Sequence, residues 1–341
     1  MRFNIQDNGK EPIYKQLIWQ VERAVRNGKL KPGEQLPSMN ELAAQLRISR
    51  ETAKKAYGIL TEKGIIIPRQ GRGFFAADLN DNTHPQVLVI FDKYSVYKQI
   101  MYNAFAERLG NEAEITILNH NQSLDLFDYY LDNNLDNYDY YVVTPHFPLD
   151  EASRARAVKL MSRIPNRKLI MLDRLTPDYS GHFGAVYQDF ENDICAGLSE
   201  AMRLRPETTK LHVLTLPASL YASEIRKGIK RFTSDNAISV EFITEVPDHI
   251  NKNDVFLILN SQLDAGLVGL ARKIQASGLE TGKNVFIISY NEFDMNELVL
   301  GGLTTVSTDF KEMGRLAADM ILNKTLYQVH CPFRINRRHT F

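Results

Sequence analysis

The sequence predicts an α/β protein with a winged helix-turn-helix at its N-terminus and a larger C-terminal part built on parallel β-sheets. Three helical patterns and a glycine-turned hairpin fill residues 12–76, and short apolar runs alternate with amphipathic stretches from residue 86 onward. A polar segment with a proline near its end, residues 78–86, separates the two patterns and is typical of a linker. We therefore expect domains at residues 1–77 and 87–341.

Composition and length exclude several classes of protein. The 341 residues are 44% hydrophobic and 24% charged, as in an ordinary globular protein. The longest apolar runs, such as Val87–Phe91, are far shorter than the ~20 residues that a membrane-spanning helix needs. The first residues lack the apolar stretch of a secretory signal, and Cys195 and Cys331 alone make no disulfide framework. We expect a cytoplasmic protein that does not enter a membrane.

Charge is divided unevenly along the chain. Residues 1–77 contain 14 Lys and Arg against 7 Asp and Glu, whereas the remaining residues contain 27 against 34. A basic part joined to an acidic part indicates that the basic part binds a polyanion. Chance variation of surface charge is the simpler alternative, so this observation needs the support of a motif.

The helices of the first part have recognisable starts. Pro12 stands where the first helix begins, and apolar residues follow it at helical spacing. Ser38 and Glu41 form a capping box for the second helix, because the hydroxyl can accept from an amide while the carboxylate reaches back. Ser49 is the expected N-cap of the third helix.

A hairpin follows the third helix, which should end at Gly64. Residues 65–70 and 74–76 are its predicted strands, around the turn Gly71-Arg72-Gly73. Helix, short turn, helix and ribbon in this order make a winged helix-turn-helix, whose third helix enters the DNA major groove. A basic glycine turn alone is more often an ordinary turn, so the prediction depends on the ordered set.

The expected DNA contacts lie on the third helix, at the start of the second helix and at the hairpin tip. Arg50 can offer a bidentate guanidinium to guanine, and the amides near Ser49 favour a phosphate. The arginines of the tip suit a minor groove or its phosphates. The predicted DNA-binding residues are Ser38, Asn40, Ser49, Arg50, Thr52, Lys54, Arg69, Gln70, Gly71 and Arg72.

These elements carry Pro12-Ile13-Tyr14, Gly28-Lys29-Leu30-Lys31-Pro32-Gly33, Leu36-Pro37-Ser38, Glu41-Leu42-Ala43, Ser49-Arg50, residues 62–66 and residues 69–74. Together, over residues 10–77, they resemble the GntR family of bacterial regulators. The resemblance implies DNA contacts by Arg50, Lys54, Gln70 and Gly71. Asn40 stands where the family commonly has Arg, which implies the loss of a guanine contact and an operator that differs from the family's common one.

The second part alternates strand-like apolar runs with helical patterns. The expected strands are residues 87–91, 115–118, 140–143, 169–172, 211–216, 255–259 and 285–289. Such alternation implies parallel sheets with helices on both faces. Ligands of these folds bind outside the carboxyl ends of the strands, so the residues that follow each run are the candidate ligand residues.

Polar or aromatic residues follow most of these runs. Asp and Asn can exchange hydrogen bonds with hydroxyl groups, and aromatic faces can pack on a sugar ring. Loops are polar in any case, so each residue alone is more simply a loop residue, and only the set points to a ligand site. The predicted ligand residues at strand ends are Asp92, Tyr94, Tyr97, Thr144, His146, Asp173, Asn260 and Asn291.

Several motifs of this part, over about residues 86–341, resemble the effector domain of the LacI/GalR regulators. They are Leu172-Asp173-Arg174, Arg226-Lys227-Gly228-Ile229, Asn260-Ser261-Gln262 with Gly266, Ser289-Tyr290-Asn291, and residues 303–306 with residues 309–314. The resemblance implies a two-lobed periplasmic-binding-protein-like fold, with ligand contacts by Asp173 and Arg226. Asn291 replaces the usual Asp, which implies a different hydrogen-bond pattern.

The combination is similar to the arabinose-repressor group. It implies a homodimeric transcriptional repressor of carbohydrate genes that binds double-stranded operator DNA and is released by a small sugar, with no catalytic residue, metal or cofactor. We expect the chain to cross between the lobes near residues 175–185, 290–292 and 306–309.

Other interpretations remain open at this stage. They are a regulator that responds to a non-sugar ligand, an enzyme with a lysine-bound pyridoxal phosphate behind a GntR head, a sugar-transport protein, and a GntR sensor that is all-helical or antiparallel. No convincing cofactor lysine, no metal-ligand spacing and no signal peptide supports the enzyme or the transport protein.

Overall fold

The computed structural model describes residues 12–26, 28–78, 84–215, 222–259 and 265–341, together with residues 3 and 5. The chain divides into two compact units, Met1–His84 and Pro85–Phe341. The division falls inside the polar segment 78–86.

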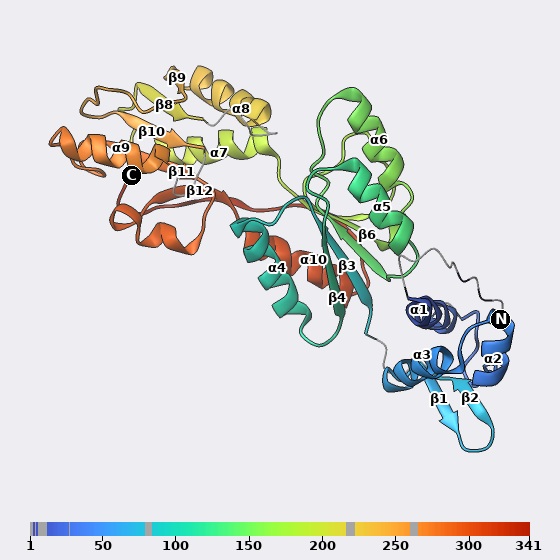
Figure 1. The fold of residues 1–341 in the computed structure, drawn as a ribbon. Coiled ribbons are helices and arrows are strands. Elements are labelled where there is room, and N and C mark those ends of the chain that lie inside the picture. The colour runs from blue at the N-terminus through green and yellow to red at the C-terminus, as the bar shows by residue number, and fades with distance from the viewer. Residues whose placement is uncertain are drawn as a thin grey trace. The chain divides into compact units, whose positions relative to one another are not determined.

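The first unit has three helices and a two-stranded antiparallel ribbon (Figure 1). Its elements are α1 (Ile13–Arg26), α2 (Met39–Leu46), α3 (Arg50–Glu62), β1 (Ile66–Arg69) and β2 (Gly73–Ala76). Leu17, Leu42 and Leu60, one from each helix, are fully buried in a common core. This arrangement confirms the predicted winged helix-turn-helix.

Both predicted N-caps are confirmed. The amide of Glu41 donates to Ser38 Oγ at 3.2 Å while the amide of Ser38 donates to Glu41 Oε2 at 2.7 Å, which completes the capping box of α2. At α3, the amide of Thr52 donates to Ser49 Oγ at 3.1 Å. Because these side chains satisfy amides that a helix start leaves open, they define where α2 and α3 begin.

The second unit contains two six-stranded sheets, each the centre of one lobe. The first sheet has the order β13-β7-β6-β5-β3-β4 and is entirely parallel, and the second has the order β14-β12-β11-β10-β8-β9, with β14 alone antiparallel. The strands of the first sheet are β3 (Gln86–Phe91), β4 (Glu114–Asn119), β5 (Tyr140–Val143), β6 (Leu169–Asp173), β7 (Gly184–Tyr187) and β13 (Gln328–His330). Those of the second are β8 (Lys210–Leu214), β9 (Ser239–Ile243), β10 (Val255–Ile258), β11 (Phe286–Tyr290), β12 (Thr304–Thr308) and β14 (Phe333–Asn336).

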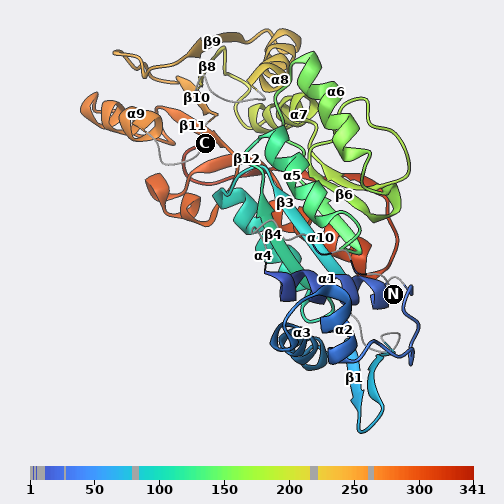
Figure 2. The ribbon, with the colours of Figure 1, turned by 45° about the vertical axis from the view of Figure 1, so that its right-hand side comes forward.

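Helices cover both faces of each sheet (Figure 2). The first sheet lies between α4 (Val96–Leu109) with α10 (Phe310–Leu322) and α5 (Leu124–Asn134) with α6 (Glu151–Met161). The second lies between α7 (Phe190–Met202) with α8 (Ala222–Asp235) and α9 (Ala265–Ala276). The short 3-10 helices are η1 (Asn166–Lys168), η2 (Asp294–Glu297) and η3 (Val299–Gly301). This confirms the predicted α/β class, since strands buried on both faces read as continuous apolar runs.

The chain crosses between the lobes three times, and the sequence placed only one crossing correctly. It crosses between β7 and α7, between β12 and α10, and between β13 and β14. The expected crossing at 306–309 is therefore right, whereas those at 175–185 and 290–292 are wrong. The strand β7 follows residue 183 and still belongs to the first sheet, and β11 and β12 pair with each other inside the second. The crossing before β14 was not predicted.

The described helices include none with the length and apolar character that crossing a membrane requires.

Candidate functional site

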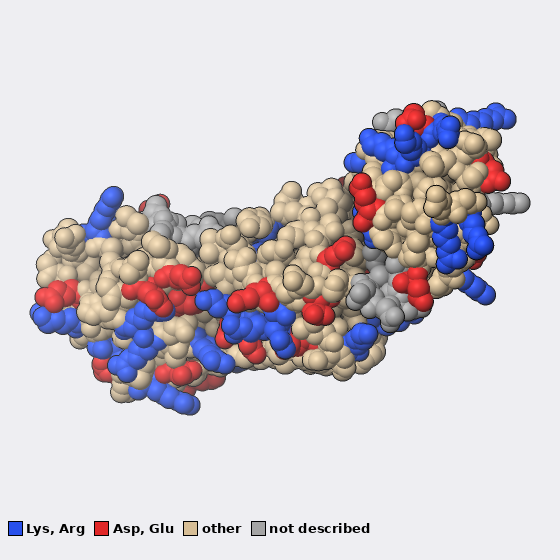
Figure 3. Space-filling model, turned by 90° about the horizontal axis from the view of Figure 1, so that it is seen from below, with Lys and Arg blue, Asp and Glu red and all other residues tan. Residues whose placement is uncertain are grey.

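All ten predicted DNA-binding residues lie in the first unit, and only Thr52 among them is partly buried. Lys and Arg side chains form groups on the surface of this unit (Figure 3, right). Arg50 is the first residue of α3 and Lys54 follows one turn later, with its Nζ 3.9 Å from the carboxylate of Glu51. Both side chains are exposed, so α3 presents a basic start to its surroundings.

The orientation of α3 depends on contacts made by its buried side. Tyr57 Oη donates to the carbonyl oxygen of Pro37 at 2.8 Å, which ties α3 to the segment before α2. Arg47 closes α2 in the left-handed conformation, with φ of 54°, and so turns the chain into α3. Thr52 Oγ1 lies 2.8 Å from Ser49 Oγ and is engaged at the helix cap. Thr52 is therefore a positioning residue of α3 as well as a candidate DNA contact.

Two side-chain contacts stabilise the conformation of the ribbon tip. Gln35 Nε2 donates to the carbonyl oxygen of Arg72 at 2.8 Å, and the guanidinium of Arg69 lies 4.7 Å from the ring centre of Phe75. Gly71 and Gly73 have φ of 71° and 95°, a region that glycine adopts readily. The tip therefore presents the Arg72 side chain on a defined backbone.

Four predicted ligand residues meet in one buried cluster at the carboxyl ends of β3, β5 and β6. The amide of Asp92 donates to Thr144 Oγ1 at 2.7 Å, and this hydroxyl donates back to Asp92 Oδ1 at 3.0 Å. His146 Nε2 lies 2.8 Å from Asp173 Oδ2. These four side chains lie at the end of β6 and in the loops after β3 and β5, three neighbouring parallel strands, as the strand-end rule predicts.

The centre of this cluster is Lys98, which the sequence analysis missed. Its Nζ lies 3.2 Å from Asp92 Oδ1 and also contacts Asp173 Oδ2, and the residue is 5% exposed. Lys98 is in the first turn of α4, which Ser95 caps, and not directly after a strand. The only signal in the sequence is a lysine on the apolar side of a helix that follows a strand-end aspartate.

Burial works against the charges in this cluster, but their mutual attraction is larger. Burial alone lowers the pKa of Lys98, and the carboxylates of Asp173 and Asp92 more than offset it, so that this pKa lies above its ordinary value. Burial likewise raises the pKa of Asp173, yet Lys98 and His146 hold it far below its ordinary value. The cluster therefore contains two carboxylates and one ammonium in their charged forms.

The cluster extends to two of the lobe crossings. Gln188 Nε2 donates to Asp173 Oδ1, and Thr308 Oγ1 donates to Gln188 Oε1 at 2.6 Å. Gln188 directly follows β7, and Thr308 is the last residue of β12. A group that displaced Asp173 would therefore act on both crossing segments.

The remaining predicted ligand residues are less tightly grouped. Tyr94 is 64% exposed. Tyr97 stacks on Phe310 at 5.3 Å and meets the edge of Phe293, from the second lobe, at 6.5 Å between ring centres. Asn260 lies outside the described residues. Asn291 follows β11 and, like Asp173, has a left-handed backbone, with φ of 75° against 73°.

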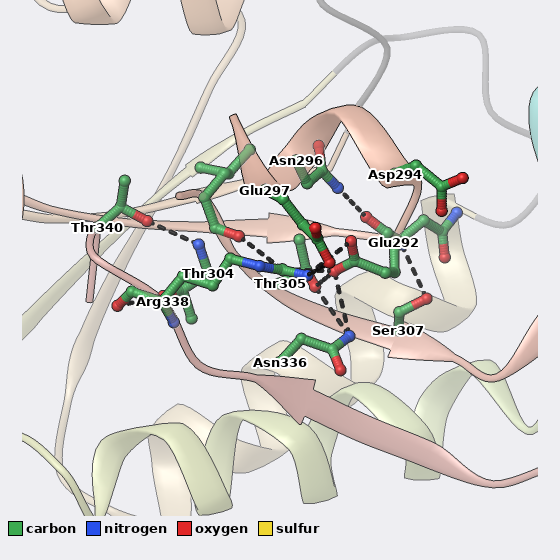
Figure 4. Close-up of polar contacts among 12 residues, drawn as sticks. Glu292, Asp294, Asn296, Glu297, Thr304, Thr305, Ser307, Asn336, Arg338 and Thr340 are labelled. Carbon is green, nitrogen blue, oxygen red and sulfur yellow. Dashed lines mark hydrogen bonds and ion pairs between the residues drawn. The ribbon is translucent and has the colours of Figure 1, made fainter. Parts of the chain in front are cut away.

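The segment that carries Asn291 is anchored by its neighbour Glu292 (Figure 4). Arg338 donates to both carboxylate oxygens of Glu292, at 2.9 and 3.2 Å, and Asn336 Nδ2 donates to Oε2 at 3.2 Å. The amide of Glu292 donates to Ser307 Oγ at 2.9 Å. These contacts join the loop after β11 to β12 and to the C-terminal residues, and they fix the side of the second lobe that carries Asn291.

The structure does not bring Arg226 to the cluster. Its guanidinium lies over the ring of Phe242, 3.9 Å from the ring centre, and the side chain is exposed. The LacI/GalR motif that this segment resembles is Arg-x-x-Gly, with two residues between the arginine and the glycine. In this chain only Lys227 separates Arg226 from Gly228, so buried Ile225 occupies the position of the motif's arginine. A shift of one residue on a helix turns a side chain by about 100°, which accounts for the difference.

His120 contacts the backbone of the ligand cluster, and its burial can be tested by its effect on stability. His120 Nε2 is 3.0 Å from the carbonyl oxygen of Thr144, and its ring stacks on Phe147 at 4.5 Å. Burial lowers the pKa of His120 from 6.5 to about 4. The unfolded chain therefore takes up a proton at a higher pH than the folded chain, and stability that is present above pH 6.5 is lost as the pH falls towards 4.

We expect the melting temperature to fall as the pH is lowered from 6.5 towards 4. The His120→Phe variant should show a smaller fall, because phenylalanine keeps the ring stack and takes up no proton. Melting curves between pH 4.5 and 7 measure this. The exposed His182 provides the control, and His182→Gln should keep the wild-type slope. A His120→Phe variant with an unchanged slope would contradict the burial of this histidine.

In sequence, the first unit is similar to bacterial transcription regulators. Residues 13–76 match the family described as "Bacterial regulatory proteins, gntR family". The chain is 38% identical over 74 residues to the HTH-type transcriptional repressor NagR of Bacillus subtilis, an alignment that covers 22% of this chain and 30% of that protein. In NagR and two further curated relatives, the part that this chain matches covers between 23% and 57% of the relative's own length.

In fold, the chain is similar to solved LacI-type repressors. The structure of the Lac repressor dimer bound to operator and the anti-inducer ONPF aligns with a TM-score of 0.58 at 16% identity, covering 96% of this chain and 98% of that one. A periplasmic binding protein/LacI transcriptional regulator from Alkaliphilus metalliredigens, complexed with D-xylulofuranose, aligns with a TM-score of 0.54 at 13% identity, covering 75% and 98%. Residues 13–76 are thus a GntR-family helix-turn-helix domain, and the unit that follows has the fold of LacI-type repressors.

Proposed function

We propose that this protein is a cytoplasmic transcriptional repressor of carbohydrate genes whose binding to operator DNA is controlled by a small sugar. The observation that carries the proposal is the buried cluster of Asp92, Thr144, His146 and Asp173 around Lys98, in a unit joined to a basic helix-turn-helix. Carboxylates, a hydroxyl and an imidazole at strand ends are the groups that bind sugar hydroxyls.

The first unit supports the DNA-binding half of the proposal. Arg50, Lys54 and Arg72 are exposed on the two elements that a winged helix-turn-helix places in DNA grooves. Asn40 is exposed at the start of α2, where it can donate to a base or a phosphate without the fork of an arginine. The solved repressor of similar fold was bound to operator DNA.

The second unit supports the sugar-binding half. Contacts between its lobes come from the carboxyl ends of both sheets, for instance Tyr97 with Phe293. A ligand at these ends touches both lobes and favours one lobe arrangement over another, which changes the DNA-binding state if the two units are coupled. The solved regulator of similar fold held D-xylulofuranose. Release of DNA by sugar is the proposed direction.

A homodimer is part of the proposal, because helix-turn-helix proteins read two half-sites with two copies. The second unit has a groove of about 480 Å³ on α9 and the segment after it, with Leu267, Val268 and Leu300 in its lining. Leu298, near this groove in the chain, is 74% exposed. Contact with a second copy of the chain would remove this apolar surface from water. A monomer in light scattering at micromolar concentration would contradict the proposed homodimer.

Arg50→Ala tests the DNA-binding role. We expect it to weaken binding to the preferred DNA sequence by ~1–3 kcal/mol and to relax the preference at one base position. The preferred sequence is first selected from a random pool with the wild-type protein, and affinities are then measured by fluorescence anisotropy. Arg154→Ala removes an exposed arginine from α6 and serves as the control. Equal losses in both variants, or no loss in either, would exclude specific base contact by Arg50.

Melting curves against a panel of monosaccharides test the sugar-binding role. A ligand that binds only the folded state raises the melting temperature by an amount that grows with its concentration. We expect one pentose or hexose to do so, and Asp173→Asn to reduce the shift because the variant removes one of the carboxylate charges that pair with Lys98. A shift with no sugar at millimolar concentration would point to a non-sugar effector.

A further inference from the structure

An ion pair between Arg174 and Glu224 joins the two lobes of the second unit beside the candidate ligand cluster. Arg174 directly follows Asp173 at the end of β6, and Glu224 is in the first turn of α8. Arg174 Nη2 lies 3.2 Å from Glu224 Oε1, and the arginine side chain is 10% exposed. The first lobe thus holds a carboxylate of the second lobe beside the candidate ligand cluster.

The other oxygen of this carboxylate, Glu224 Oε2, is buried and lacks a hydrogen-bond donor among the described residues. A buried carboxylate oxygen without a donor is costly, because it has lost its water and gained no replacement. A ligand hydroxyl that donated to Oε2 would remove this cost.

The register of α8 explains why Glu224 takes this place. Gly228 faces α7, because a Cβ atom there would lie 2.2 Å from the carbonyl oxygen of Glu191. Glu224 is one turn before Gly228 and shares its side of the helix, whereas Arg226 is two positions away and points elsewhere. The helix therefore brings a carboxylate to the lobe boundary, not the guanidinium that the family motif implies.

The charges at this boundary select against anions. Among the described residues of the ligand cluster and the Arg174–Glu224 pair, the acidic side chains are Asp92, Asp173 and Glu224. The cations there are paired with them: Lys98 with both aspartates and Arg174 with Glu224, while His146 contacts Asp173. A phosphate or carboxylate on a ligand would meet like charges there. A neutral polyhydroxyl compound meets hydrogen-bond acceptors instead.

We propose that Glu224, held by Arg174, binds a hydroxyl of the effector from the second lobe and, with Asp92 and Asp173, restricts the effector to neutral sugars. Sugar phosphates and sugar acids are excluded. This inference rests on the proposed sugar-binding function and adds to it the charge class of the effector and a contact residue.

The first test compares neutral and anionic partners of the same sugar on the wild-type full-length protein. The pairs are xylulose and xylulose 5-phosphate, ribose and ribose 5-phosphate, and galactose and galacturonate, extended by the phosphate and acid of any neutral sugar that raises the melting temperature. We expect shifts with neutral members alone. A shift with only the anionic member of a pair overturns the inference but keeps the sugar-binding function. If no sugar shifts the melting temperature, both the inference and the proposed sugar-binding function are overturned.

The second test uses Glu224→Gln with a matched control. Glutamine keeps the size of the side chain but loses its charge, and we expect the affinity for the neutral sugar to fall about tenfold in calorimetric titration. Glu191→Gln breaks an ion pair with Arg231, 3.0 Å long, inside the second lobe and should leave that affinity unchanged. Circular dichroism establishes that both variants are folded.

Glu224→Asp keeps the charge and serves if Glu224→Gln does not fold. We expect it to bind the neutral sugar more weakly and still to reject the anionic partner. Unchanged affinity in Glu224→Gln, or an equal loss in Glu191→Gln, overturns the role of Glu224. Gain of binding to the anionic partner in Glu224→Asp overturns it as well.

Discussion

The second unit depends on the burial of Lys98 between the carboxylates of Asp92 and Asp173. A buried charge is tolerated only when it is paired, so this lysine requires the end of β3, the end of β6 and the start of α4 to meet. Gln188 and Thr308 extend the same network to two lobe crossings. One set of hydrogen bonds and ion pairs therefore both shapes the candidate ligand site and reaches two of the segments that connect the lobes.

The two lobes contribute unlike chemistry to their boundary. The first lobe supplies a network of paired charges. The second supplies Glu224, with one buried oxygen that lacks a donor among the described residues, and Asn291 on a loop that Glu292 anchors. Asp173 and Asn291 both end a strand in the left-handed backbone conformation, which asparagine and aspartate adopt more readily than most residues. Such local strain is often found at binding sites.

Patterns local in the sequence were predictable, and those set by packing were not. The caps at Ser38 and Ser49 and the long apolar strands follow from neighbouring residues, and so does the placement of Asp92 and Asp173 at strand ends. Lys98 was missed because Asp173, its second carboxylate partner, is 75 residues away in the sequence, although Asp92 is near. The assignment of Arg226 was wrong for a local reason, since only Lys227 separates it from Gly228, which packs against α7. The strand β7 was missed because it begins with glycine and alanine and so lacks a run of large apolar residues.

We propose that a ligand bound at the lobe boundary changes the affinity of the protein for DNA. The most direct measurement is the affinity of the full-length protein for its selected DNA sequence, by fluorescence anisotropy, with and without a saturating sugar that raises its melting temperature. The account predicts that the sugar weakens DNA binding by a factor between about 5 and 150, the usual range of coupling between two sites. An affinity for DNA that the bound sugar leaves unchanged would contradict it.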